Sequence, residues 1–262
     1  MPEHGVIFLM YHELETPGRA LRQDETGYVR YVVRENDFRA QMAWLKSEGW
    51  KGLSVGDAIA SFAGKTVAIT FDDGCETDLL VAAPILREFD FGATFYITHG
   101  WSGQPGYLSH AQLCELSALG FEIGCHSMSH SYLTDLDDAG LRREIVDPKL
   151  HLEKVIGKPI EHFSCPGGRF DQRVAQMARE TGYCTVATSE IQANTPSTDR
   201  FVLGRIAIMR HTLLHEFRQL CNGRGLWRWK LGGQFRGGVR NALGNSVYDR
   251  LREVLLGKGV SG

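Results

Sequence analysis

The sequence lacks the features that define several protein classes. It has no apolar run long enough to cross a membrane, and the apolar residues 6–10 are too few for a signal peptide. Its six cysteines form no CxxC pair and no small-protein disulfide spacing, which indicates reduced thiols. It also contains no phosphate-binding glycine loop, dinucleotide fingerprint or nucleic-acid motif. These absences predict a cytoplasmic protein that does not bind nucleic acid.

Charge of either sign is moderate overall but unevenly distributed. The formal net charge is −2. From Arg200 onward the sequence has twelve Lys or Arg and three Asp or Glu, a net charge of +9, so the preceding residues carry −11. Residues 223–262 are rich in glycine and arginine and include Trp227 and Trp229. We interpret them as a basic tail with one late helix at residues 247–256. This tail either packs over the preceding domain or contacts an anionic membrane surface or polymer.

Short apolar stretches alternate with helical patterns over residues 1–222. Strands are predicted at residues 6–11, 52–55, 66–71, 93–97, 121–125, 162–165, 183–187 and 202–208. Helices are predicted between them, at about 37–47, 56–62, 78–89, 111–119 and 171–182, together with a long helix that opens within 135–138 and reaches about 156. Such alternation is typical of the α/β class with a parallel sheet, and the number of units favours a barrel over an open sheet. In such a barrel, chemistry collects at the carboxyl ends of the strands.

Two short motifs lie about fifty residues apart, and each follows a predicted strand. The first is TFDDG at residues 70–74, and the second is HSMSH at residues 126–130. The barrel would therefore bring two carboxylates and two imidazoles to one edge of the sheet. One carboxylate and two neutral imidazoles can hold a divalent metal and leave positions open for water and substrate. The second carboxylate is then free to act as a base.

The spacing within the two motifs bears on this interpretation. His126 and His130 are four residues apart, which places both imidazoles on one face of a single helical turn, as in other zinc sites. Asp72 and Asp73 cannot point the same way from an extended strand, but they can diverge where the chain turns at Gly74. Helix-capping acids or surface histidines explain either motif alone. Together, the motifs favour a hydrolytic metal site.

With these motifs the chain resembles the NodB-homology polysaccharide deacetylases, a carbohydrate esterase family. The resemblance covers most of the chain, from about residue 6 to residue 188. It includes three further stretches, ATFY at 93–96, GFEIG at 120–124 and LT at 133–134. The resemblance implies a distorted (β/α) barrel of seven or so strands that removes N-acetyl groups from amino sugars. It also implies one divalent metal, usually zinc, with cobalt and nickel as alternatives.

The resemblance further implies a role for each residue of the two motifs. Asp72 would be the general base, and Asp73, His126 and His130 would be the metal ligands. These roles are chemically consistent, because a metal polarises the acetyl carbonyl and acidifies its bound water, while a carboxylate accepts the water proton. Backbone N–H groups would help to hold the oxyanion, and an acid must protonate the departing amine.

The third family motif usually carries an arginine, a proline and a glycine. The matching stretch here is SCPGGR at residues 164–169, in which Ser164 occupies the usual arginine position. The arginine that normally orients the base is therefore missing from that position. One hypothesis is that Arg169 replaces it from the other side, and the alternative is that Arg169 is a surface cation. By its place in the motif, the backbone N–H of Gly167 is the candidate donor to the oxyanion.

The general acid has two candidates. His211 follows a predicted strand near the end of the barrel, where the family usually carries a late histidine. His12 also ends a strand, and the sequence LMYH at residues 9–12 resembles the opening of the exopolysaccharide-type subgroup, as though the barrel were permuted. We favour His12 and keep His211 as the alternative.

Several other residues near the motifs admit two interpretations. Tyr96, Trp101 and Tyr107 are candidates for a sugar-binding platform, although aromatic residues in loops are as often packing residues. Cys75, Cys125 and Cys165 lie beside the motifs, and we interpret them as small buried residues rather than zinc ligands.

The sequence thus predicts a metal-dependent hydrolase that removes N-acetyl groups from an amino-sugar glycan, in exopolysaccharide or cell-envelope synthesis. A second hypothesis keeps the chemistry but changes the substrate to a small or lipid-linked acetylated sugar or a non-sugar amide. A third is a glycan-binding protein whose catalytic site has decayed, which only the altered third motif supports.

Overall fold

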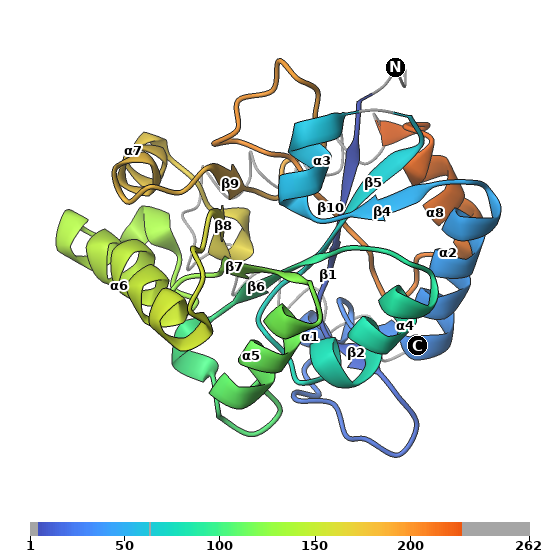
Figure 1. Cartoon of the computed structure of the whole chain (residues 1–262), viewed down its shortest axis with the longest axis horizontal. Coiled ribbons are helices and arrows are strands. Elements are labelled where there is room, and N and C mark those ends of the chain that lie inside the picture. The colour runs from blue at the N-terminus through green and yellow to red at the C-terminus, as the bar shows by residue number, and fades with distance from the viewer. Residues whose placement is uncertain (1–4, 63, 227–262) are drawn as a thin grey trace.

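Figure 1 shows the computed structural model, in which residues 5–62 and 64–226 are described. The predicted helix at 247–256 and the tail tryptophans Trp227 and Trp229 lie outside the described residues. No helix among the described residues combines the length and the apolar character needed to cross a bilayer.

A curled parallel sheet forms the centre of the molecule, with helices packed around it (Figure 1). Its strands are β1 (Ile7–Tyr11), β4 (Lys51–Leu53), β5 (Thr66–Phe71), β6 (Thr94–Ile97), β7 (Glu122–Cys125), β8 (His162–Ser164), β9 (Thr185–Ala187) and β10 (Ile206–Ala207). They are hydrogen-bonded in the order β10-β1-β5-β6-β7-β8-β9, and β4 pairs with the first half of β5. A separate small sheet pairs β2 (Leu14–Glu15) with β3 (Val33–Arg34).

The sheet curls far enough to meet itself. Leu203 forms a parallel bridge with Ala187 of β9, and β10, which follows directly, pairs with β1. The short segment from Leu203 to β10 therefore connects the last strand to the first. The predicted distorted (β/α) barrel of about seven strands is confirmed, although the predicted strand at 202–208 shrinks to two residues of regular ladder.

The helices follow the predicted alternation. They are α1 (Thr26–Val29), α2 (Glu35–Ser47), α3 (Val55–Ser61), α4 (Ala83–Glu88), α5 (His110–Ala118), α6 (Asp138–Ile156), α7 (Gln172–Glu180) and α8 (Leu214–Cys221). Ser109 caps α5 through a capping box, and Gly157 ends α6 in the left-handed conformation, as these residue types favour. The predicted helix at 78–89 differs, because its first turn, Asp78–Ala82, is a π-helix.

Side chains that alternate along the strands form two separate hydrophobic cores. The outer core holds Ile7, Leu9 and Tyr11 of β1 and Val67, Ile69 and Phe71 of β5, packed against the surrounding helices. The inner core lies within the barrel, where Phe8, Ala68 and Tyr96 meet Val55 and Ala58 of α3. Side chains therefore alternate between the helix side and the barrel interior.

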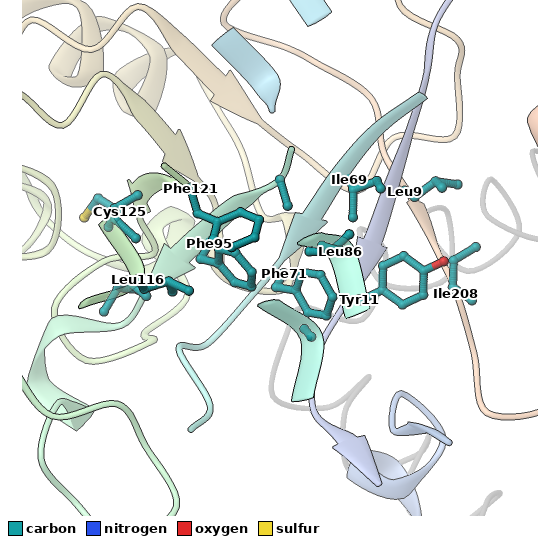
Figure 2. Close-up of a cluster of buried hydrophobic side chains, with 14 of the residues drawn as sticks. Leu9, Tyr11, Ile69, Phe71, Leu86, Phe95, Leu116, Phe121, Cys125 and Ile208 are labelled. Carbon is teal, nitrogen blue, oxygen red and sulfur yellow. The ribbon is translucent and has the colours of Figure 1, made fainter. Parts of the chain in front are cut away.

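Aromatic residues fix the strand ends from outside. Figure 2 shows Tyr11, Phe71 and Phe95 in a row across β1, β5 and β6. The Tyr11 and Phe71 rings stack at 5.3 Å between centroids, and the Phe71 and Phe95 rings stack at 5.0 Å. Because Tyr11 and Phe71 face the helices, the residues that follow them, His12 and Asp72, face the barrel interior.

A polar network closes the amino end of the barrel beneath α3. The Glu122 carboxylate, at the start of β7, accepts hydrogen bonds from the Thr94 hydroxyl and from the Gly56 N–H. Its Oε2 lies 3.2 Å from Nε2 of His162, which in turn contacts the Thr185 hydroxyl. Burial alone would raise the pKa of Glu122, but the hydrogen bond and charge of His162 and the other hydrogen bonds outweigh burial, so the pKa lies below 4.5.

This network predicts a pH-dependent contribution to stability. A carboxyl whose pKa is lowered by folding stabilises the protein above its unfolded-state pKa, and the contribution is lost as the pH falls. Glu122→Gln should therefore lower the free energy of unfolding by about 1–3 kcal/mol at pH 7. The difference from the wild type should shrink at pH 4 and below. Urea unfolding at several pH values measures it, and a difference that does not depend on pH would contradict this assignment.

Candidate active site

The two predicted motifs and His12 meet at the carboxyl ends of adjacent strands. Asp72 and Asp73 follow β5, His126 follows β7, and His12 follows β1. The residue before each of Asp72, His126 and His12 is buried in the outer core, which turns the next side chain toward the barrel interior. The edge of the sheet thus gathers the chemistry that the sequence predicted there.

Three potential ligand atoms converge at this edge. Oδ1 of Asp73 lies 3.7 Å from Nε2 of His126 and 3.5 Å from Nε2 of His130. The ligand atoms of these three residues all lie within 4.8 Å of one another. Asp73 reaches this position with a φ of 82°, a left-handed conformation that is uncommon for a residue other than glycine. These separations are short enough for Asp73 and the two imidazoles to bind one ion that lies about 2 Å from each ligand atom.

The chemistry of these atoms fits a cation. Nδ1 of His126 lies 2.8 Å from the carbonyl oxygen of Ser164, so Nδ1 carries the proton and Nε2 presents a lone pair. Burial lowers the pKa of His126 to about 4, which keeps the imidazole neutral. Oδ1 of Asp73 has no hydrogen-bond partner within the described part of the chain. A buried anionic oxygen that faces a lone pair is unfavourable unless a cation lies between them.

The loop that carries the two histidines is not a helical turn, contrary to our prediction. Ser127 and His130 both have left-handed backbone conformations, with φ of 71° and 63°, so the four-residue spacing acts through an irregular loop. The two imidazole rings still lie 5.0 Å apart. Glu144 of α6 holds the loop, since its carboxylate accepts hydrogen bonds from the backbone N–H groups of Met128 and Ser129. Tertiary contacts rather than helical periodicity therefore position these rings.

Arg205 is the residue that contacts Asp72. Its guanidinium lies 2.6 Å from Oδ1 and 2.8 Å from Oδ2 of Asp72, a bidentate pair. It also donates to the Thr70 hydroxyl, the Ser164 hydroxyl and the Thr188 carbonyl oxygen. Its five N–H groups thus have five acceptors, and its side chain is fully buried.

The Arg205 pair determines the charge of Asp72. Burial opposes ionisation of Asp72, but the charge of Arg205, then that of His126, and the Arg205 hydrogen bonds outweigh burial. The pKa of Asp72 is consequently held below its usual range. Asp72 also lies beside the three ligand atoms, with Oδ2 3.8 Å from Nε2 of His126. An ionised carboxylate therefore adjoins the candidate ion site.

The prediction that Arg169 replaces the missing motif arginine requires correction. The guanidinium of Arg169 lies over the Tyr132 ring, 4.3 Å from its centroid, whereas Arg205 occupies both oxygens of Asp72. The Ser164 hydroxyl, at the usual arginine position, is instead an acceptor for Arg205. The sequence does hold a signal for Arg205, because it lies between apolar residues in the predicted strand at 202–208, and a buried arginine is rare unless paired.

His12 and His211 lie in different surroundings. His12 is partly buried, its Nδ1 has no hydrogen-bond partner among described atoms, and burial lowers its pKa against the opposing charges of Asp73 and Asp72. His211 is exposed and lines a cavity of about 610 Å³ together with Arg34 and Arg210. His12, Asp72 and Asp73 do not line that cavity. Of the two candidate histidines, these observations place only His12 near the carboxylates of Asp72 and Asp73.

The remaining predicted residues lie in different parts of the structure. Gly167 lies in an exposed turn after β8 with a φ of 58°, and a Cβ there would approach the Tyr132 ring to 2.8 Å, so glycine is required. Trp101 and Tyr107 border the site, since the Trp101 ring stacks on His130 at 5.1 Å and lies 5.0 Å from Tyr107. Tyr96 is wrongly predicted as a sugar contact, because it is fully buried beneath Arg205 in the inner core.

The cysteines beside the motifs are buried, as predicted. Cys75, Cys125 and Cys165 are all free and buried. The metal-ligand group found in the described part of the chain contains no thiol. Burial raises the pKa of Cys125 to about 12, which disfavours the thiolate that a metal would require.

A parallel barrel whose strand ends bring carboxylates and imidazoles together is typical of a metal-dependent hydrolase. Comparisons with known proteins show which family the chain resembles. Residues 60–186 match the family model described as polysaccharide deacetylase. The chain is 36% identical over 126 residues to a peptidoglycan-N-acetylglucosamine deacetylase of Bacillus cereus, covering 48% of this chain and 57% of that protein. It is 26% identical over 208 residues to a poly-beta-1,6-N-acetyl-D-glucosamine N-deacetylase of Staphylococcus aureus, covering 72% of each.

A solved structure agrees with these relatives. The Streptococcus pyogenes deacetylase PplD, in complex with acetate, superposes with a TM-score of 0.74 at 25% identity, covering 84% of this chain and 98% of that one. These matches agree with the resemblance of the motifs to the polysaccharide deacetylase family.

Proposed function

We propose that the chain hydrolyses N-acetyl groups of an amino-sugar glycan with the help of one divalent cation, most simply Zn²⁺, with Co²⁺ or Ni²⁺ as alternatives. The observation that carries this proposal is the convergence of Asp73, His126 and His130 beside the ionised Asp72. The names of two relatives support the substrate class, because one is a deacetylase of the N-acetylglucosamine of peptidoglycan and the other a deacetylase of poly-beta-1,6-N-acetyl-D-glucosamine. We further propose a role in exopolysaccharide or cell-envelope synthesis, which the names of these two relatives support.

Asp73, His126 and His130 would hold the cation, which when bound would polarise the acetyl carbonyl and acidify the attacking water. Asp72, kept ionised by Arg205, would accept a proton from the water as its oxygen adds to the carbonyl carbon. The Gly167 N–H would donate to the resulting oxyanion. His12 in its protonated form would then give a proton to the amine nitrogen as the C–N bond breaks, releasing acetate and a free amine.

Acetate release tests this proposal. The purified chain should release acetate from N-acetylated oligosaccharides when Zn²⁺, Co²⁺ or Ni²⁺ is added, and a chelator should abolish the release. A panel that varies linkage and length separates a polymer substrate from a small or lipid-linked sugar. Absence of acetate release from every member of the panel, together with glycan binding, would support the decayed-site hypothesis instead. The complete set of Asp72, Asp73, His126 and His130 argues against that outcome.

The choice of general acid gives a separate prediction. His12→Ala should lower kcat by about 10²-fold or more, since positioned proton transfer contributes that much to many hydrolases. His211→Ala should leave kcat within about twofold, because exposed residues away from a site have small effects. Steady-state kinetics of both variants decide the matter. If His12→Ala keeps full turnover and His211→Ala loses it, the assignment is wrong.

A further inference from the structure

An arginine with a largely buried side chain contacts Oδ2 of the proposed ligand Asp73. Nη2 of Arg22 lies 3.3 Å from Oδ2 of Asp73, and the Arg22 side chain is only 7% exposed. Its other terminal nitrogen, Nη1, lies 3.5 Å from Sγ of Cys75. Arg22 belongs to the irregular segment between β2 and α1, far in sequence from the motifs. No pattern in the sequence had marked it.

Three aromatic rings hold the guanidinium of Arg22 in place. Its Cζ lies 4.2 Å from the centroid of Tyr107, 4.7 Å from that of Tyr28 and 5.4 Å from that of Trp101. The first two distances lie well within the range of a cation–π contact. The buried Glu13 carboxylate accepts a hydrogen bond from the Tyr28 hydroxyl and another from the Arg22 backbone N–H. The position of the guanidinium is thus fixed both by rings and by its own backbone.

The two oxygens of Asp73 consequently have different surroundings. Oδ2 has the Arg22 guanidinium, whereas Oδ1 faces the two imidazoles and has no hydrogen-bond partner among the described residues. Hydrogen bonds from neighbouring groups commonly orient a ligating carboxylate and tune its affinity for the ion. An arginine on Oδ2 leaves Oδ1 as the single carboxylate oxygen of Asp73 that faces the imidazoles as a ligand atom for the cation.

We propose that Arg22 is a positioning residue that fixes Asp73 with Oδ1 directed at the cation site. This inference rests on the proposed function, because it takes Asp73 as a cation ligand. Two effects of Arg22 oppose each other: its positive charge repels a cation, and its hydrogen bond orders the carboxylate. Since the carboxylate is buried and Oδ2 would otherwise lack a donor, ordering outweighs repulsion, and loss of Arg22 weakens cation binding.

The test measures cation affinity rather than turnover. Zn²⁺ affinity is determined by competition with a chromophoric chelator for the full chain and for Arg22→Met, Arg22→Lys and Asp73→Asn. Arg22→Met should bind Zn²⁺ about 10- to 100-fold more weakly, the usual effect of losing a group that orients a ligand. Arg22→Lys should fall between, because lysine keeps the charge without the planar fork. The absorption spectrum of bound Co²⁺ should change in Arg22→Met, since that spectrum reports coordination geometry.

Arg19→Met is the matched control. Arg19 lies in the same segment and pairs with Glu76, and its side chain is 27% exposed. This variant should keep Zn²⁺ affinity within about threefold, as expected for a partly exposed ion pair. Circular dichroism and the thermal midpoint establish that each variant is folded, and if Arg22→Met does not fold, Arg22→Lys decides.

The outcomes separate this inference from the proposed function. Unchanged or tighter Zn²⁺ binding by the folded Arg22 variants, with weak binding by Asp73→Asn, would overturn the role of Arg22 alone. If the wild-type chain and Asp73→Asn show the same absence of Zn²⁺ binding, the cation site itself is refuted.

Discussion

Asp72→Asn is expected to reduce the rate of acetate release by about 10³-fold or more at saturating substrate, the upper part of the range for loss of a positioned base. The amide has nearly the shape of the carboxylate but cannot accept a proton. Cation affinity should stay within a few-fold of the wild type, because the converging ligand atoms belong to Asp73, His126 and His130. Measured together, kcat and the Zn²⁺ dissociation constant separate loss of the base from loss of the ion.

Two controls sharpen this result. Asp73→Asn should lose activity and Zn²⁺ affinity together, whereas Asp72→Asn should lose activity alone. Because Asn leaves the charge of buried Arg205 without its anionic partner, the thermal midpoint of Asp72→Asn must be measured, and rates must be compared below it. A folded, zinc-loaded Asp72→Asn enzyme with near-normal turnover would show that another group serves as the base.

Much of the fold could be predicted because its signals are local. The apolar run at residues 66–71 has a strand's length and composition, and the strand β5 has those bounds. Ser109 and Gly157 mark helix ends through bonds to their own neighbourhoods. The convergence of Asp73, His126 and His130 was also predictable, since parallel strands deliver their carboxyl ends to one edge. Each inference needed only nearby sequence and the general geometry of a barrel.

The features that could not be predicted depend on contacts between distant residues. Arg205 is 133 residues from Asp72, and nothing in the composition around either residue specifies the other. The left-handed residues of the histidine loop depend on Glu144 of a later helix, which no spacing rule within the loop reveals. Tyr96 was misassigned because an aromatic near a strand end can face the interior or the cleft. It lies in the inner core because the residue before it, Phe95, belongs to the outer core.

Arg205→Met should have the second large effect, in this case on stability. Removal of one partner leaves the buried Asp72 charge uncompensated and deprives the Thr70 and Ser164 hydroxyls and the Thr188 carbonyl of a donor. Breaking a buried pair in this way typically costs about 3–5 kcal/mol of unfolding free energy. Deacetylase activity should fall as well, because Asp72 loses the group that orients it. Urea unfolding and kinetics at a temperature where the variant is folded measure the two effects.

A double-mutant cycle with Ser164 shows whether the effect comes from the charge pair itself. The hydroxyl of Ser164 lies 2.7 Å from Nη2 of Arg205 and 3.4 Å from Oδ2 of Asp72, so a guanidinium on β8 could reach the same carboxylate. Ser164→Arg should destabilise the chain when Arg205 is present, since two like charges would be buried together. The same substitution should stabilise the Arg205→Ser variant. Such a reversal of sign is the signature of two residues that compete for one partner. If Ser164→Arg destabilises both backgrounds equally, Arg205 stabilises the barrel through packing, and its charge on Asp72 is secondary.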